Sequence, residues 1–74
     1  MSTQALPPFQ IELNGEPHTI ADDARLSALV QRLKLRKGRI AIEINRAVIA
    51  KSEWESRLLH PGDRVEIVNF VGGG

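Results

Sequence analysis

The residues with the clearest chemical potential are the last three, Gly72, Gly73 and Gly74, which follow an apolar segment directly. A segment without Cβ atoms is thin and flexible, so it can enter a narrow channel that any side chain would block. The α-carboxyl group of Gly74 would be ionised at neutral pH, since its reference pKa is about 3.3–3.7. The pattern indicates a tether at 72–74 that presents a carboxylate to another protein, although a glycine run also fits a plain disordered end.

The remaining candidate side chains do not form a convincing catalytic or metal-binding pattern. His18 and His60 are isolated from each other, and the chain contains no cysteine, which excludes zinc–thiolate sites, iron–sulfur sites and a catalytic thiol. Ser56, His60 and Asp63 can be combined into a triad on paper, but no nucleophile elbow or phosphate-binding loop accompanies them. We therefore expect no metal site, no catalytic triad and no phosphate-binding loop among these residues.

Length and composition point to one small domain. The chain has 74 residues, 42% of them hydrophobic, and a formal net charge of +1, which disfavours a protein that works mainly by gripping nucleic acid or acidic membranes. Residues 1–8 include Pro7-Pro8 and lack the basic start and apolar stretch of a signal peptide. We expect a loose leader at 1–8, a folded domain at 9–71, a tail at 72–74 and a cytoplasmic location.

A cluster of positive charge occupies the middle of the chain. The run from Arg32 to Arg39 contains five basic residues, and no aromatic residue for stacking nucleic-acid bases lies among them. The simplest interpretation is a solvated helix end, where cations interact favourably with the helix dipole. The alternative that stays open is a patch that meets an acidic protein partner.

Hydrophobic periodicity predicts the first half of a mixed α/β fold. Alternation over 9–13 predicts a strand, Asn14-Gly15 a tight turn, and 18–20 a second strand that Pro17 places at an edge or at its own start. Leu26, Leu29, Val30 and Leu33 have helical spacing. We expect Asp22 or Asp23 to cap this helix and Gly38 to occupy the left-handed position after its end.

The second half of the chain predicts the rest of the sheet. Alternating isoleucines over 40–44 predict a third strand, Asn45-Arg46 a turn, and 47–49 a short apolar stretch. A helical turn at 52–55 would place Trp54 beside the core, and 64–71 would form the last strand. The order describes an α+β fold with a mixed sheet of four to five strands and one main helix packed across one face.

The last strand carries a candidate contact surface. If Val65 and Ile67 face the helix, Val68 and Phe70 lie on the open face of the sheet, because side chains alternate along a strand. Exposed apolar residues in a cluster mark interaction sites. The alternative is that the loop carrying Trp54 covers them.

Taken together, these residues resemble the sulfur carrier family of thiamin biosynthesis, ThiS, whose members have the β-grasp (ubiquitin-like) fold. The resemblance extends from Phe9 to the end of the chain, apart from a longer leader and a glycine at Gly72 where another small residue is common. It is carried by Asn14-Gly15, by Ile42-Glu43-Ile44-Asn45, by Val48-Ile49 with Trp54, by the stretch Leu58-Leu59-His60-Pro61-Gly62-Asp63-Arg64-Val65-Glu66-Ile67-Val68, and by the terminal Gly73-Gly74.

The resemblance implies a carrier that other enzymes act upon, with no cofactor bound by the chain itself and no enzymatic activity of its own. A ThiF-type adenylating enzyme would use ATP and magnesium to convert the Gly74 carboxylate into an acyl-adenylate. Sulfur from a cysteine desulfurase or another donor would then give a thiocarboxylate at Gly74, for delivery to thiazole synthase, ThiG. In this scheme Gly72 and Gly73 are the tether, and Val68 and Phe70 belong to the docking surface.

Three other functions share parts of this pattern. The small subunit of molybdopterin synthase has the same fold and terminal diglycine, and a ubiquitin-like modifier uses the same activated terminus against a lysine amine. A β-grasp binding module would not require a free terminal glycine. A residue added after Gly74 should abolish the carrier and modifier functions and be tolerated by a binding module.

Overall fold

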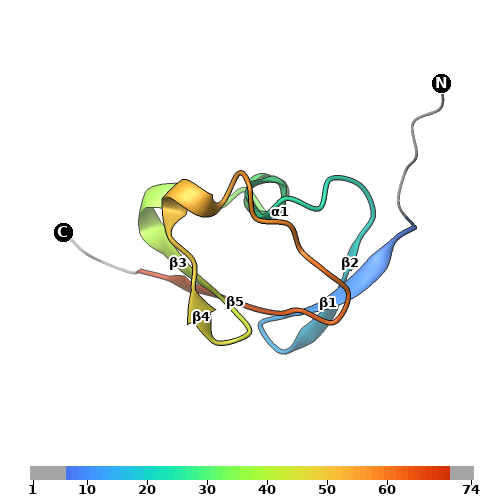
Figure 1. Ribbon diagram of the computed structural model, residues 1–74. Helices are drawn as coiled ribbons and strands as arrows, with labels where there is room; N and C mark the ends of the chain where they lie inside the picture. Colours follow the sequence, from blue (N-terminus) through green and yellow to red (C-terminus); the bar gives the residue numbers. More distant parts are fainter. Residues whose placement is uncertain (1–6, 71–74) are drawn as a thin grey trace, which may run out of the picture.

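The computed structural model describes residues 7–70, in which a five-stranded mixed sheet carries one α-helix across one face (Figure 1). The strand order is β2-β1-β5-β3-β4, with β1 and β5 parallel and the other neighbours antiparallel. This confirms the predicted mixed sheet with one main helix. The elements are β1 (Phe9–Leu13), β2 (Glu16–Ile20), α1 (Leu26–Arg32), η1 (Lys37–Arg39), β3 (Ile40–Ile44), β4 (Ala47–Val48), η2 (Lys51–Glu53) and β5 (Arg64–Asn69), where η denotes a 3₁₀ helix.

Some sequence expectations concern residues beyond this range. Most of the leader at 1–8, the end of the last strand at Val71 and the glycine tail at 72–74 lie outside the described residues. The division into leader, domain and tail therefore stays a prediction. Within 7–70, α1 has only seven residues, and no helix has the length and apolarity that a membrane span needs.

Both hairpins turn through residues with left-handed backbone. Asn14 and Gly15 join β1 to β2 with φ of 49° and 86°, and Asn45 and Arg46 join β3 to β4 with φ of 52° and 73°. Two consecutive positive φ values match the right-handed twist of the paired strands. Asparagine and glycine adopt them readily, whereas Arg46 does so at a steric cost. Both turns are where the sequence predicted them, and β2, with Pro17, is an edge strand as expected.

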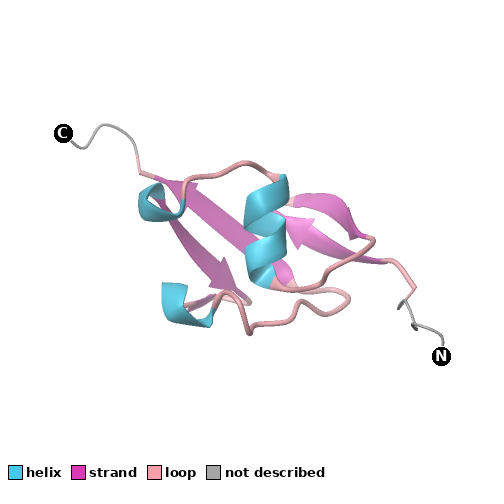
Figure 2. Ribbon diagram, turned by 90° about the horizontal axis from the view of Figure 1, so that it is seen from above, coloured by secondary structure: helices cyan, strands magenta, loops and turns pink. Residues whose placement is uncertain are grey.

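The core lies between the sheet and α1 (Figure 2). Trp54 is 2% exposed, and its indole N–H donates a hydrogen bond to the Ile49 carbonyl at 3.1 Å, so the buried ring has no unsatisfied polar atom. The alternating isoleucines of β3 supply three members of the core, as predicted. The buried hydrophobic residues are Ile11, Ile20, Leu26, Leu29, Val30, Ile40, Ile42, Ile44, Ile49, Trp54, Leu59 and Val65.

The expected cap at the start of the helix is wrong. The N-cap of α1 is Arg25, with no side-chain cap, and neither Asp22 nor Asp23 accepts a hydrogen bond from the first turn. The first helical amides instead donate to carbonyls of the distant loop: Leu26 N–H to Arg57 at 2.8 Å and Ser27 N–H to Trp54 at 3.0 Å. A side-chain cap is unnecessary because tertiary contacts satisfy these donors.

The expected end of the helix is also wrong. The helix ends at Arg32, and Lys34, not Gly38, has the left-handed backbone, with φ of 58°. The Lys34 amide donates to Gln31 at 3.0 Å and the Leu35 amide to Val30 at 3.2 Å, which is the hydrogen-bond pattern of a Schellman motif. Leu35 then packs against the core, so the apolar anchor fixes the helix end four residues earlier than glycine placement suggested.

Candidate functional site

The candidate site is built around β5, which lies in the middle of the sheet between β1 and β3. Side chains of the two hairpin turns hold it on both sides. Asn14 Oδ1 accepts from the Ile67 amide at 2.8 Å, and Asn45 Oδ1 accepts from the Arg64 amide at 2.9 Å. The asparagines therefore do more than tolerate positive φ, because they also fix the position of the strand that precedes the glycine tail.

The far end of β5 is tied to the loop after the helix. Asn69 pairs with Ile40 in the sheet, and the Phe70 amide donates to the Arg39 carbonyl at 2.7 Å. This bond lies immediately before the first residue outside the described range. The backbone is thus held by hydrogen bonds as far as Phe70.

Val68 and Phe70 are exposed, as the alternation predicted, with 54% and 55% of their surface accessible. Val65, on the opposite face of β5, is fully buried. The alternative that the loop of Trp54 covers the two residues is wrong, because the indole is buried in the core instead. Whether Val68 and Phe70 contact a partner stays a prediction.

A third apolar residue, which the sequence did not predict, lies on this face. Val48 is 71% exposed and stands opposite Glu43 in the β3–β4 pairing, which places it on the side away from the core. Its position two residues after the Asn45-Arg46 turn was the available signal, because that turn fixes the register of the hairpin and pairs Val48 with Glu43. We call Val48, Val68 and Phe70 the apolar face.

Carboxylates border the apolar face. Glu43 and Glu66 are direct cross-strand partners, so two like charges face each other on the side away from the helix. Such a pair destabilises a sheet modestly. Glu12, further along the same face, lies 3.8 Å from Arg64 in an exposed ion pair.

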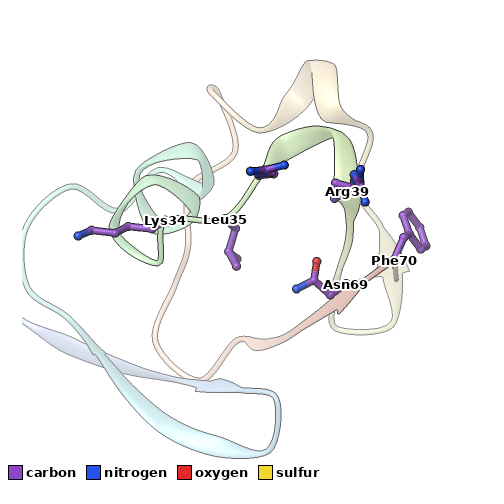
Figure 3. Close-up of a pocket in the computed structure, with 6 residues that line it drawn as sticks. Lys34, Leu35, Arg39, Asn69 and Phe70 are labelled. Carbon is purple, nitrogen blue, oxygen red and sulfur yellow. The ribbon is translucent and has the colours of Figure 1, made fainter. Parts of the chain in front are cut away.

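A hollow of about 280 Å³ lies where the loop after the helix passes the end of β5 (Figure 3). Asn69 points into the arc of this loop, whereas Phe70 points away from it beside Arg39. Among the described residues, three cationic side chains and no carboxylate contribute to the lining. We call it the basic hollow; its lining residues are Lys34, Leu35, Arg36, Arg39, Asn69 and Phe70.

The other candidates from the sequence have structural contacts. The Asp63 carboxylate accepts from the His60 amide at 2.9 Å and from Asn45 Nδ2 at 3.0 Å, while Ser56 Oγ donates to the Glu53 carbonyl at 3.3 Å. The structure does not assemble a triad from these residues. Within residues 7–70, no three His, Cys, Asp or Glu side chains are grouped closely enough to hold a metal ion.

One carboxyl group on the surface has a shifted pKa. Hydrogen bonds from the Arg25 side chain, one of them 3.0 Å long from Nε, and from the Arg25 amide lower the pKa of Asp23 to about 2. The pair lies in the segment before α1, remote in sequence from β5. Asp23 therefore does not cap α1, as the sequence predicted, but forms an ion pair with Arg25 that fixes the segment leading into the helix.

Comparison with known proteins connects this geometry to one family. The model of the ThiS family matches residues 11–74. The crystal structure of the thiamine biosynthesis protein ThiS from Geobacter metallireducens superposes with a TM-score of 0.75 at 26% identity, covering 89% of this chain and 100% of that one. The β-grasp expectation is therefore confirmed.

Two curated relatives show different lengths. The chain is 23% identical over 66 residues to the sulfur carrier protein ThiS of Escherichia coli, covering 89% of this chain and all of that protein. It is 35% identical over 66 residues to a thiazole synthase of Magnetococcus marinus, but it spans only 20% of that protein's length. Since the family model matches most of the sequence, the chain belongs to the ThiS family.

Proposed function

We propose that this chain is a sulfur carrier that serves formation of the thiazole ring of thiamin. The observation that carries the proposal is the match of residues 11–74 to the ThiS family, which includes the terminal glycines. The fold of the G. metallireducens protein and the name of the E. coli relative support the same function. On this proposal the chain is a substrate of other enzymes and performs no catalysis itself.

The chemistry takes place at the Gly74 carboxylate. A carboxylate is a poor electrophile, so a ThiF-type enzyme with ATP and magnesium first joins it to AMP and releases pyrophosphate. Hydrosulfide then attacks the acyl carbon and AMP leaves, which gives the thiocarboxylate. If a cysteine desulfurase supplies a persulfide, the product is an acyl disulfide, and a thiol must reduce its S–S bond.

The described part of the chain supplies a rigid base for that chemistry. Hydrogen bonds from Asn14 and Asn45 and the bond between Phe70 and Arg39 fix β5 up to the point where the tail follows. A fixed base reduces the conformational entropy lost when the tail enters a partner's channel. Gly72 and Gly73 then act as the tether between this base and the reacting group.

Thiazole synthase, ThiG, is the proposed acceptor of the sulfur. Part of the thiazole synthase of M. marinus resembles this chain, and a second thiazole synthase, from Paramagnetospirillum magneticum, resembles it at 31% identity. These likenesses place a ThiS-like segment in proteins with the name of the proposed acceptor. They support a thiazole-forming pathway over transfer to molybdopterin or to a lysine.

Intact-mass spectrometry tests the carrier chemistry. The full chain is incubated with a ThiF-type enzyme, ATP, magnesium and sulfide, and its mass is compared before and after. We expect a gain equal to exchange of one oxygen for sulfur, assigned to Gly74 by fragmentation. The matched control carries one alanine after Gly74 and should gain nothing. No gain in the unmodified chain, with an enzyme proven active on its own carrier, would overturn the proposal.

A separate pair of variants tests the apolar face as a docking surface. Val68→Asp should weaken binding to the adenylating enzyme and to thiazole synthase, because it places a charge where an apolar contact forms. Leu58→Asp is the matched control. The exposed fraction of Leu58, 51%, is similar to the 54% of Val68, but Leu58 lines a different hollow, with Pro7 and Phe9 near the start of β1. Equal binding by the two variants in calorimetry would remove the apolar face from the proposal.

A further inference from the structure

The cationic side chains of the basic hollow have no counterion among residues 7–70. Lys34, Arg36 and Arg39 are exposed, and no hydrogen bond or ion pair joins their side chains to another described residue. Lys37, in the same loop, is unpaired in the same sense. Four like charges gathered on one short loop repel each other, so an anionic surface brought to this loop would be attracted strongly at low salt.

The position of Lys34 adds an independent observation. Its left-handed backbone, with φ of 58°, is a conformation in which glycine costs far less than a residue with a Cβ atom. The Schellman motif therefore holds a lysine where glycine would be more stable. Strained residues cluster at functional sites. Arg46, the other residue with positive φ that is neither asparagine nor glycine, is accounted for by its hairpin turn, whereas Lys34 lines the basic hollow.

The distribution of charge favours a protein over a nucleic acid as the binding partner. The cations of the loop lie at the end of β5, beside Asn69. Glu66 and Glu43 are paired on the face of the sheet away from the helix, next to the apolar face. A phosphate backbone extending from the basic hollow across the apolar face would be repelled by these carboxylates. A protein surface can present acidic groups to the hollow and apolar groups to Val68 and Phe70.

We propose that the basic hollow docks an acidic segment of the adenylating enzyme, next to the channel that receives the glycine tail. The proposal rests on the carrier function proposed above. The Phe70–Arg39 hydrogen bond holds the cationic loop against Phe70, so a carboxylate bound in the hollow would lie beside the last described residue before the tail. The hollow would thus attract the enzyme to the reacting end of the chain.

The test is charge reversal with a matched control of equal net charge. Arg36→Glu/Arg39→Glu reverses two cations of the hollow, and Arg46→Glu/Lys51→Glu reverses two exposed cations outside it. For each variant the rate of pyrophosphate release by the ThiF-type enzyme is measured against carrier concentration at low and high salt. Circular dichroism verifies that both variants retain the fold.

The reversal in the hollow should raise the KM for the carrier about tenfold at low salt, leave kcat at saturation nearly unchanged and lose its effect at high salt. The control should stay within about twofold of the unmodified chain. Equal KM values for the two variants would overturn the docking site. Tight binding of single-stranded RNA, lost only in the hollow variant while the KM is unchanged, would reassign the hollow to nucleic acid.

Failure of the carrier function gives a different result. In that case the unmodified chain itself supports no pyrophosphate release at any concentration or salt. If the unmodified chain supports pyrophosphate release and the hollow variant has the same KM, only the docking site is contradicted. The two failures are therefore separated by the behaviour of the unmodified chain.

Discussion

Replacing Lys34 with glycine is expected to stabilise the fold. Lys34 is exposed, so its side chain contributes little buried surface, but its φ of 58° is in the left-handed region. That conformation costs a residue with a Cβ atom about 1–2 kcal/mol. Glycine loses about 0.4–1 kcal/mol more conformational entropy on folding. The difference between the middles of these two ranges is a gain of about 0.8 kcal/mol in the free energy of unfolding.

Thermal unfolding followed by circular dichroism measures this gain. For a domain of this size the melting temperature of Lys34→Gly should rise by about 3–6 °C. Lys34→Gln is the control, because it removes the same charge from the basic hollow but keeps a residue with a Cβ atom in the left-handed conformation. If the glycine variant melts at or below the temperature of the glutamine variant, backbone strain at Lys34 is not a source of instability. That strain would then no longer support the proposal that the basic hollow is a docking site.

Three further changes test the contacts that position β5 and the helix. Asn14→Gly keeps the turn conformation but removes the acceptor 2.8 Å from the Ile67 amide, so urea unfolding should show a loss of about 1 kcal/mol; an unchanged midpoint would contradict this. Glu66→Gln removes one of two facing carboxylates and should add roughly 0.2–1 kcal/mol at low salt and less at high salt; a gain independent of salt would argue against repulsion. The lowered pKa of Asp23, about 2, means that its ion pair stabilises the fold fully above pH 3.8 and loses this effect as the pH falls through about 2. Arg25→Gln should return the NMR titration midpoint of Asp23 toward 3.8, and a midpoint still near 2 would exclude Arg25 as the cause.

Local sequence patterns predicted the elements whose determinants are themselves local. The alternation of Ile40, Ile42 and Ile44 and the turns at Asn14-Gly15 and Asn45-Arg46 need only their own residues to be recognised. The exposure of Val68 and Phe70 followed from the same alternation. The prediction for Val68 and Phe70 is confirmed because a one-residue shift of β5 would move Val65 out of the core.

The start of the helix was mispredicted because its determinants are distant in sequence. An aspartate before an apolar run is the usual capping signal, and Asp23 fits it. The carbonyls of Trp54 and Arg57 accept the first helical amides instead, and nothing near Leu26 indicates that they will be present. Asp23 is thereby left to form its ion pair with Arg25.

The misplaced end of the helix also explains why the sequence left the role of the basic run open between a solvated helix end and a patch that meets an acidic protein. Had the helix continued toward Gly38, its cations would have been distributed around a helical surface, as the solvated-end interpretation assumed. The chain instead reverses at Lys34, because Leu35 packs into the core and completes the Schellman hydrogen bonds. The segment from 35 to 39 therefore crosses the end of β5 and bonds to Phe70. One leucine thus converts a run of basic residues into a charged rim beside the base of the tail, so a polar substitution of Leu35 should disturb both the helix end and the docking proposed for the hollow.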